Sequence, residues 1–147
     1  MKNLWFAHRG FKRVWKVIEP HIAALICDQK FKRIIISGYS HGGALALLCH
    51  EYCKFNRPEA IVEGYGFDAP RVVWGFFGGV VKKRFDGFTI IRNCCDIVTH
   101  LPPSIFGFRH VGKMIKIGVG RDYNPVESHY GNNILKELEE YERCQEN

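Results

Sequence analysis

The sequence lacks the features that define several other classes of protein. It has six cysteines in 147 residues and no Cys-x-x-Cys pair. That density is below the density of a disulfide scaffold and the spacing does not suit zinc, so we expect reduced thiols and no metal. No stretch is apolar over the length of a membrane span, and the first residues lack the apolar core of a signal peptide. We therefore expect no membrane span and, by default, a cytoplasmic protein.

An acidic excess is also missing. Lys and Arg number 21 against 15 Asp and Glu, which gives a net charge of +6. The basic residues are scattered in small groups such as Lys12-Arg13 and Lys82–Arg84, as is typical of solvated helix ends and faces, so we expect no nucleic-acid partner. With 46% apolar residues the chain is long enough to bury one core, and we expect a single domain over residues 1–147.

A strand-turn-helix pattern organises the chain. Arg33–Ser37 is rich in β-branched residues and favours a strand, whereas Ala44–Leu48 favours a helix. Between them, Gly38–Gly42 places a serine with a glycine two positions away on either side, which is the nucleophile-elbow pattern. Such a turn lifts the hydroxyl of Ser40 above the strand, so we predict a nucleophile there; a tight turn without chemistry is the alternative. The backbone N–H of His41 opens the helix and is the candidate oxyanion donor.

The rest of the chain alternates between strand and helix patterns. Pro20 lies inside the first helical pattern and should kink or divide it. Alternating elements predict an α/β fold with a largely parallel sheet of about four to five strands, right-handed crossovers and flanking helices. The patterns predict helices over residues 10–29, 44–56, 72–85 and 129–144, and strands over residues 33–37, 61–67, 87–92 and 111–119.

A nucleophilic serine requires a base, and the base requires an orienting acid. In a parallel sheet, functional residues gather beyond the carboxyl ends of the strands. Asp96 follows the strand over residues 87–92 and is favoured as the acid over Asp68, which follows the preceding strand. His129 follows the last strand and is favoured as the base over His110, which leads into that strand and should lie near its amino end.

Six segments of the sequence match a known family in the family's order: Ala7–Phe11, Gly38–Ala46, Gly66–Val72, Asn93–Pro103, Phe106–His110 and Ser128–Tyr130. Through these segments the sequence resembles class 3 lipases, the fungal-lipase-like α/β-hydrolases. The resemblance implies hydrolysis of carboxylic esters through an acyl-enzyme intermediate, with Ser40 as nucleophile, Asp96 as orienting acid and His129 as base. It implies an ester or lipid substrate and no cofactor or metal. We assign the candidate substrate pocket to Tyr39, Pro70, Leu101 and Pro102.

The sequence also departs from the family pattern. Tyr39 and His41 stand where the family usually has His and Leu, so the pocket beside the nucleophile should be more polar. Family members carry several strands, a second oxyanion donor and often a lid helix before the segment that begins here at Ala7. We therefore expect a reduced α/β-hydrolase core whose elbow strand has an open edge, covered by a homodimer or another partner. The alternative function is a weak or inactive hydrolase-fold fragment with a binding or assembly role.

Overall fold

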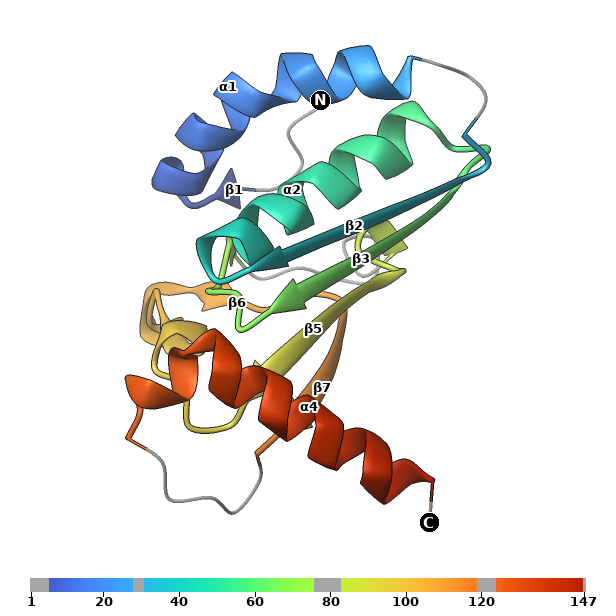
Figure 1. Cartoon of the computed structure of the whole chain (residues 1–147). Helices are drawn as coiled ribbons and strands as arrows, with labels where there is room; N and C mark the ends of the chain where they lie inside the picture. Colours follow the sequence, from blue (N-terminus) through green and yellow to red (C-terminus); the bar gives the residue numbers. More distant parts are fainter. Residues whose placement is uncertain (1–5, 28–30, 76–82, 119–123, 147) are drawn as a thin grey trace.

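The fold is built on a four-stranded parallel sheet. The computed structural model describes residues 6–27, 31–75, 83–118 and 124–146. The strands lie in the order β2-β3-β5-β7 (Figure 1), and every neighbouring pair is parallel. This sheet confirms the predicted α/β class and falls within the predicted number of strands. The bounds are Arg33–Tyr39 for β2, Ile61–Phe67 for β3, Phe88–Asn93 for β5 and Lys113–Ile117 for β7.

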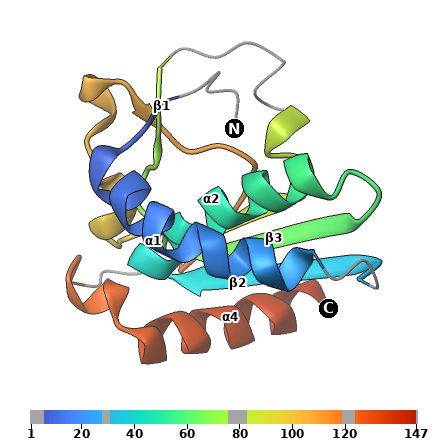
Figure 2. The ribbon, with the colours of Figure 1, turned by 90° about the horizontal axis from the view of Figure 1, so that it is seen from above.

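Helices cover both faces of this sheet. Seen from above, α1 (Arg9–Ile26) and α2 (His41–Asn56) lie on one side and α4 (Gly131–Gln145) lies on the other (Figure 2). Because successive strand side chains point to opposite faces, the sheet supplies apolar side chains to both layers. The larger core lies on the α2 side and includes Leu47, Leu48, Val62, Phe88 and Ile90. The smaller core, on the α4 side, contains Ile91, Ile117 and Ile134.

A second, three-stranded sheet lies beside the first. It is antiparallel in the order β1-β4-β6, and its strands are Phe6–Ala7, Val73–Trp74 and Phe108–Arg109. The helix expected over residues 72–85 is therefore wrong at its start, while residues 76–82 lie outside the described residues. Val73 is β-branched and Trp74 is aromatic, and both residue types favour strands. Gly75, whose φ is 116°, ends that strand.

Two helices differ in detail from the expectation. Pro20 lies inside α1 but does not divide it, since the helix runs through residues 9–26. The proline is exposed, so the hydrogen bond that it removes lies on the side that faces water. At the other end of the chain, His129 precedes α4 and belongs to a short 3₁₀ turn, Glu127–His129. Among the helices that the structure describes, none is long and apolar enough to cross a membrane.

Candidate active site

Ser40 occupies a strained turn between β2 and α2. Its φ of 54° and ψ of −123° lie outside the regions that L-residues favour. The turn is held in place by the Ser40 N–H, which donates to the Phe67 carbonyl at 2.8 Å. A side chain at Gly38 would collide with the backbone carbonyl of Gly42, so the turn requires glycine at the end of the strand. This backbone is the strand-turn-helix geometry that the elbow pattern predicts.

The motif points to Gly42 as the second crowded glycine of the turn, but in the structure the crowded position is Gly43. A Cβ at Gly42 would meet nothing within 4 Å, whereas a Cβ at Gly43 would lie 2.8 Å from the Ala69 Cβ. Gly43 therefore lets α2 pack against the loop after β3. His41 is the first residue of α2, so its N–H has no partner within the helix and lies at the positive end of the helix dipole.

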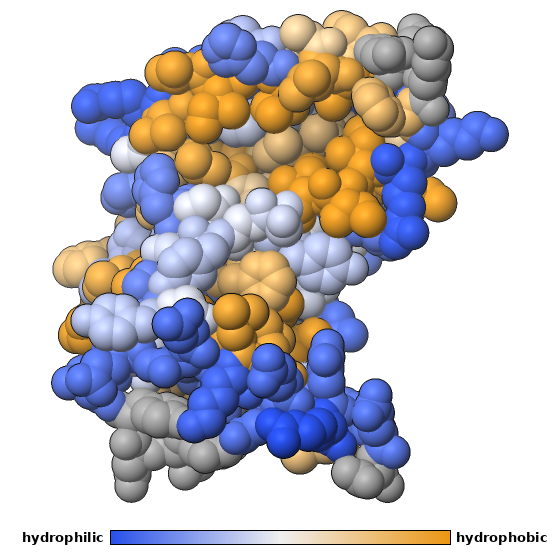
Figure 3. Space-filling model, viewed as in Figure 1, coloured by the Kyte–Doolittle hydropathy of each residue, from blue (hydrophilic) through white to orange (hydrophobic). Residues whose placement is uncertain are grey.

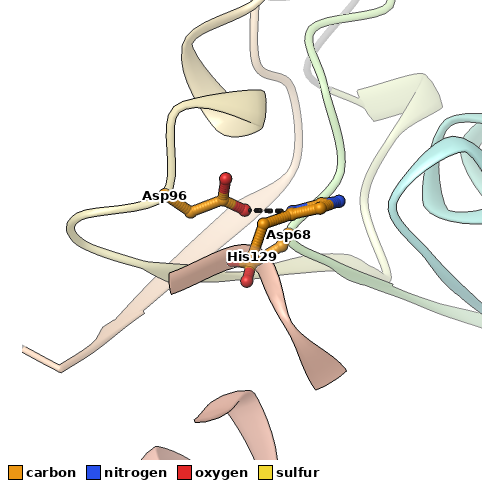
Figure 4. A group of neighbouring side chains, drawn as sticks. All are labelled: Asp68, Asp96 and His129. Carbon is orange, nitrogen blue, oxygen red and sulfur yellow. Dashed lines mark hydrogen bonds and ion pairs between the residues drawn. The ribbon is translucent and has the colours of Figure 1, made fainter. Parts of the chain in front are cut away.

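Three predicted side chains form one hydrogen-bonded chain. The distance between Ser40 Oγ and His129 Nε2 is 2.7 Å. On the other side of the imidazole, His129 Nδ1 lies 2.6 Å from Asp96 Oδ2 (Figure 4). Asp96 is fully buried, and its Oδ1 accepts a hydrogen bond from the Val98 N–H at 2.7 Å, which fixes the carboxylate. The structure thus brings together residues that are 33 and 89 positions apart.

Two further residues, Tyr39 and Asn93, hold His129 and the residue before it in place. The ring of Tyr39 stacks on it, with centroids 5.1 Å apart, and the Tyr39 hydroxyl donates to the His129 carbonyl. The Asn93 side-chain amide donates to the Ser128 carbonyl at 3.0 Å. Sequence reasoning missed Asn93; the available signal was a polar residue at the end of a strand, three positions before Asp96.

Asp68, the alternative candidate for the orienting acid, lies beside Asp96 and His129. It is fully buried, with a positive φ of 43°, and its Oδ1 accepts from the Asn93 N–H at 2.6 Å. Burial raises the pKa of Asp68 to about 8; the Asn93 N–H opposes this shift and the nearby Asp96 adds to it. Ligand atoms of Asp68, Asp96 and His129 lie within 4.8 Å of one another, a spacing that a metal ion could use. The ligand atoms of Asp96 and His129, however, are already hydrogen-bonded to each other.

The other candidate histidines lie outside this chain of hydrogen bonds. The Nε2 of His110 contacts the Thr99 carbonyl at 2.8 Å, and burial lowers the pKa of His110 to about 4. His100 accepts a hydrogen bond from Arg92. Burial and the neighbouring arginines lower the pKa of His100 as well.

The predicted pocket residues divide into two groups. Tyr39 lies against His129, as described above. The other three come together through Arg71, whose N–H donates to the Leu101 carbonyl at 2.6 Å and whose guanidinium donates to the Pro102 carbonyl at 3.0 Å. Pro70 is buried, whereas Leu101 is 45% exposed. The loops that follow β3 and β5 therefore lie side by side.

A cavity of about 590 Å³ lies between the start of α1 and the strands β1, β4 and β6. Ring contacts connect it to the elbow: Phe108 contacts His8 at 5.6 Å, His8 contacts Phe11 at 4.9 Å, and Phe11 contacts His41 at 5.3 Å between ring centroids. Two basic side chains give its wall a positive charge. The cavity is lined by Ala7, His8, Arg9, Lys12, Trp74 and Phe108.

The parallel sheet, the strained serine turn and the Ser-His-Asp arrangement define an α/β-hydrolase fold of the serine type. The chain belongs to the class 3 lipase family, because the family profile described as "Lipase (class 3)" matches residues 3–106. It is 33% identical to a lipase of Rhizomucor miehei over 115 residues, which cover 72% of this chain and 31% of that protein. It is 29% identical to secreted mono- and diacylglycerol lipase 1 of Fusarium solani over 70% of this chain and 32% of that protein.

Solved structures agree with this assignment. The complex of Rhizomucor miehei lipase with its propeptide superposes with a TM-score of 0.68 at 31% identity, over 79% of this chain and 40% of that chain. A triacylglycerol lipase whose catalytic centre is formed by a serine protease triad superposes with a TM-score of 0.66 at 31% identity, over 78% of this chain and 46% of that chain. The chain spans about a third of the length of these curated relatives.

Proposed function

We propose that the protein hydrolyses carboxylic esters, with Ser40 as nucleophile, His129 as base and Asp96 as orienting acid. The observation that carries this proposal is the continuous hydrogen-bonded chain through these three side chains, at 2.7 and 2.6 Å, with the serine in a strained turn. A serine hydroxyl is a weak nucleophile unless an oriented base can take its proton, and this geometry supplies the base and its orienting partner.

The geometry suits an acyl-enzyme route. As Ser40 Oγ attacks the ester carbonyl carbon, His129 Nε2 takes its proton, and Asp96 stabilises the imidazolium that forms. The oxyanion develops beside the His41 N–H, where the free donor and the helix dipole favour negative charge. His129 then returns the proton to the leaving alcohol. Attack of water on the acyl-enzyme, by the same proton transfers, restores Ser40, so the route requires neither a metal nor a cofactor.

We propose esters with an apolar acyl group as the substrate class. Support comes from the relatives, which include a lipase and a mono- and diacylglycerol lipase. It comes also from exposed apolar side chains that follow Asp96 or flank His129 in the sequence, because water-exposed apolar groups favour contact with an acyl chain. These side chains are Ile97, Leu101, Ile105, Phe106, Val126 and Tyr130.

A role in assembly is the second candidate, favoured by the open edge of β2. Within the described residues β2 pairs with β3 alone, and β1, the first described strand, belongs to the other sheet. Ile35 is 60% exposed beside this edge. Apolar surface gathers in the upper half of Figure 3, in the region of α1, α2 and β2. We propose that a second copy or another partner covers this edge, since unpaired strand edges recruit chains.

Covalent labelling tests the proposed chemistry. A fluorophosphonate probe should label the wild-type protein and leave Ser40→Ala unlabelled, because the probe reacts with an activated serine hydroxyl. Nitrophenyl esters of graded chain length should then be hydrolysed, with a preference that reports the acyl-binding surface. Equal labelling of both proteins, or no labelling of a folded wild type, would contradict the assignment and favour the assembly role.

A further inference from the structure

Two buried carboxyl groups face a single histidine. Asp68 follows β3 and Asp96 follows β5, and these strands are parallel neighbours whose carboxyl ends lie at one edge of the sheet. Figure 4 shows both acids beside His129, with the hydrogen bond drawn to Asp96. One oxygen of Asp68 accepts from the Asn93 N–H, and the buried Oδ2, for which the described residues offer no donor, can donate a hydrogen bond to Asp96 when Asp68 is protonated.

An ionised, buried carboxylate with no donor for one of its oxygens would be costly, which favours the protonated form of Asp68. The backbone at Asp68 is also strained, because a positive φ is unfavourable for residues other than glycine. The ionisable groups that act on Asp68 are Asp96 and Arg92, and Tyr39 and His129 lie beside these acids. Burial and the Asp96 carboxylate keep Asp68 protonated near neutral pH. Asp96 is therefore the one ionised acid of the pair, and it accepts the hydrogen bond from His129 Nδ1.

We propose that Asp68 is a second positioning acid for His129, which accepts the Nδ1 hydrogen bond when Asp96 is lost. Two observations support this role. An oxygen of Asp68 and a ring nitrogen of His129 already lie within 4.8 Å of each other, so a movement of about 2 Å would bring them to hydrogen-bond distance. Removing Asp96 also removes a negative charge and a hydrogen bond that both disfavour ionisation of Asp68, whereas burial, the largest cause of its raised pKa, remains.

A double-mutant cycle tests this proposal, which rests on the proposed function of Ser40. The variants are Asp68→Asn, Asp96→Ala and the double variant. Asparagine keeps an oxygen that can accept from the Asn93 N–H, so the substitution removes the charge and preserves that contact. We expect Asp68→Asn to lower kcat less than about 3-fold beside an intact Asp96, and about 10-fold or more in the Asp96→Ala background, with KM little changed.

A structural role for Asp68 predicts a different result. It would give the same fold-loss in both backgrounds, and that result would overturn the proposal. The proton on His129 Nδ1 provides an independent readout, because a strong hydrogen bond to a carboxylate moves its NMR resonance far downfield. This resonance should persist in Asp96→Ala and disappear in the double variant; its absence from Asp96→Ala also overturns the proposal, even if the Asp68 variants fail to fold.

The outcomes separate this inference from the proposed function. Fluorophosphonate labelling that is unaffected by Ser40→Ala would remove the proposed function itself. Labelling that depends on Ser40, together with equal effects of Asp68→Asn in the two backgrounds, would leave the hydrolase assignment standing and remove only the role of Asp68. The labelling rate replaces kcat wherever ester turnover is too slow to follow.

Discussion

At the residue scale, the hydrogen-bonded chain from Ser40 to Asp96 makes a sharp prediction. We expect His129→Ala and Asp96→Asn each to lower ester turnover by roughly 10³-fold or more, because the first removes the base and the second places an amide beside the imidazole, which favours the wrong tautomer of His129. Circular dichroism should be unchanged. His110→Ala is the control, since this ring contacts a backbone carbonyl outside the chain, and its effect should be far milder. Loss of turnover in His110→Ala but not in His129→Ala would reverse the assignment.

The raised pKa of Asp68 makes a second prediction at this scale, on stability. The ordinary pKa of 3.8 is raised to about 8 in the folded protein, so between these values the folded state holds a proton that the unfolded chain has released. The free energy of unfolding must therefore fall as pH rises, by up to about 1.4 kcal/mol per unit from this group. Asp68→Asn should remove that slope.

Urea unfolding at pH 5, 6, 7 and 8 measures this effect directly. The difference in stability between the variant and the wild type should grow in favour of the variant by about 1.4 kcal/mol per unit from pH 5 to pH 7. His50 and His110 have lowered pKa values and contribute a slope of opposite sign, but they are common to both proteins and cancel in the difference. Parallel curves would show that Asp68 ionises normally in the folded state.

At the scale of elements, the structure predicts different effects of substituting the two glycines of the elbow, Gly38 and Gly42. Gly38→Ala should destabilise the protein by about 1–3 kcal/mol and abolish fluorophosphonate labelling, because its Cβ collides with the Gly42 carbonyl. Gly42→Ala is the matched control. Its Cβ meets open space and it lies in a helix, so stability should stay equal or rise by up to about 1 kcal/mol. Thermal unfolding distinguishes them, and equal losses would contradict the observed packing.

The same scale shows what sequence patterns can and cannot predict. The β-branched residues of β2 and β5, and those that begin β3, predicted strands because turns bound these segments, and the parallel arrangement followed from their alternation with helices. The β4 strand was missed because two residues have no period. Its pairing with Phe6–Ala7 and Phe108–Arg109 is set by tertiary contacts.

The sequence could predict those residues of the candidate site whose location follows from their position after a strand. Ser40, Asp96 and His129 each follow a strand, so the carboxyl edge of the sheet gathers them. The contacts of Asn93 with Ser128, and of Tyr39 with His129, were not predictable, because they join residues at least 35 positions apart through side-chain orientation. The same limit applies to Asp68, which the sequence offered as an alternative to Asp96 and the structure places beside it.

At the scale of the whole molecule, β2 carries the elbow at one end, and one of its edges has no strand partner among the described residues. Its side chains alternate between exposed and half-buried, with Ile34 and Ile36 packed on the α2 side and Ile35 exposed on the other face. An apolar side chain beside unpaired backbone groups favours the addition of another strand. A dimer that pairs two β2 edges is the simplest closed solution, because its contacts are the same on both copies.

The last prediction concerns this edge. The chain should self-associate, and Ile35→Lys should shift it toward the monomer, because a charged side chain at an edge opposes strand addition. Leu135→Lys is the matched control: it is equally exposed, at 60%, but lies on α4 at the other end of the sheet order. Light scattering across a concentration series measures the mass of each. A wild-type monomer at every concentration, or dissociation by both substitutions alike, would show that β2 is not the interface.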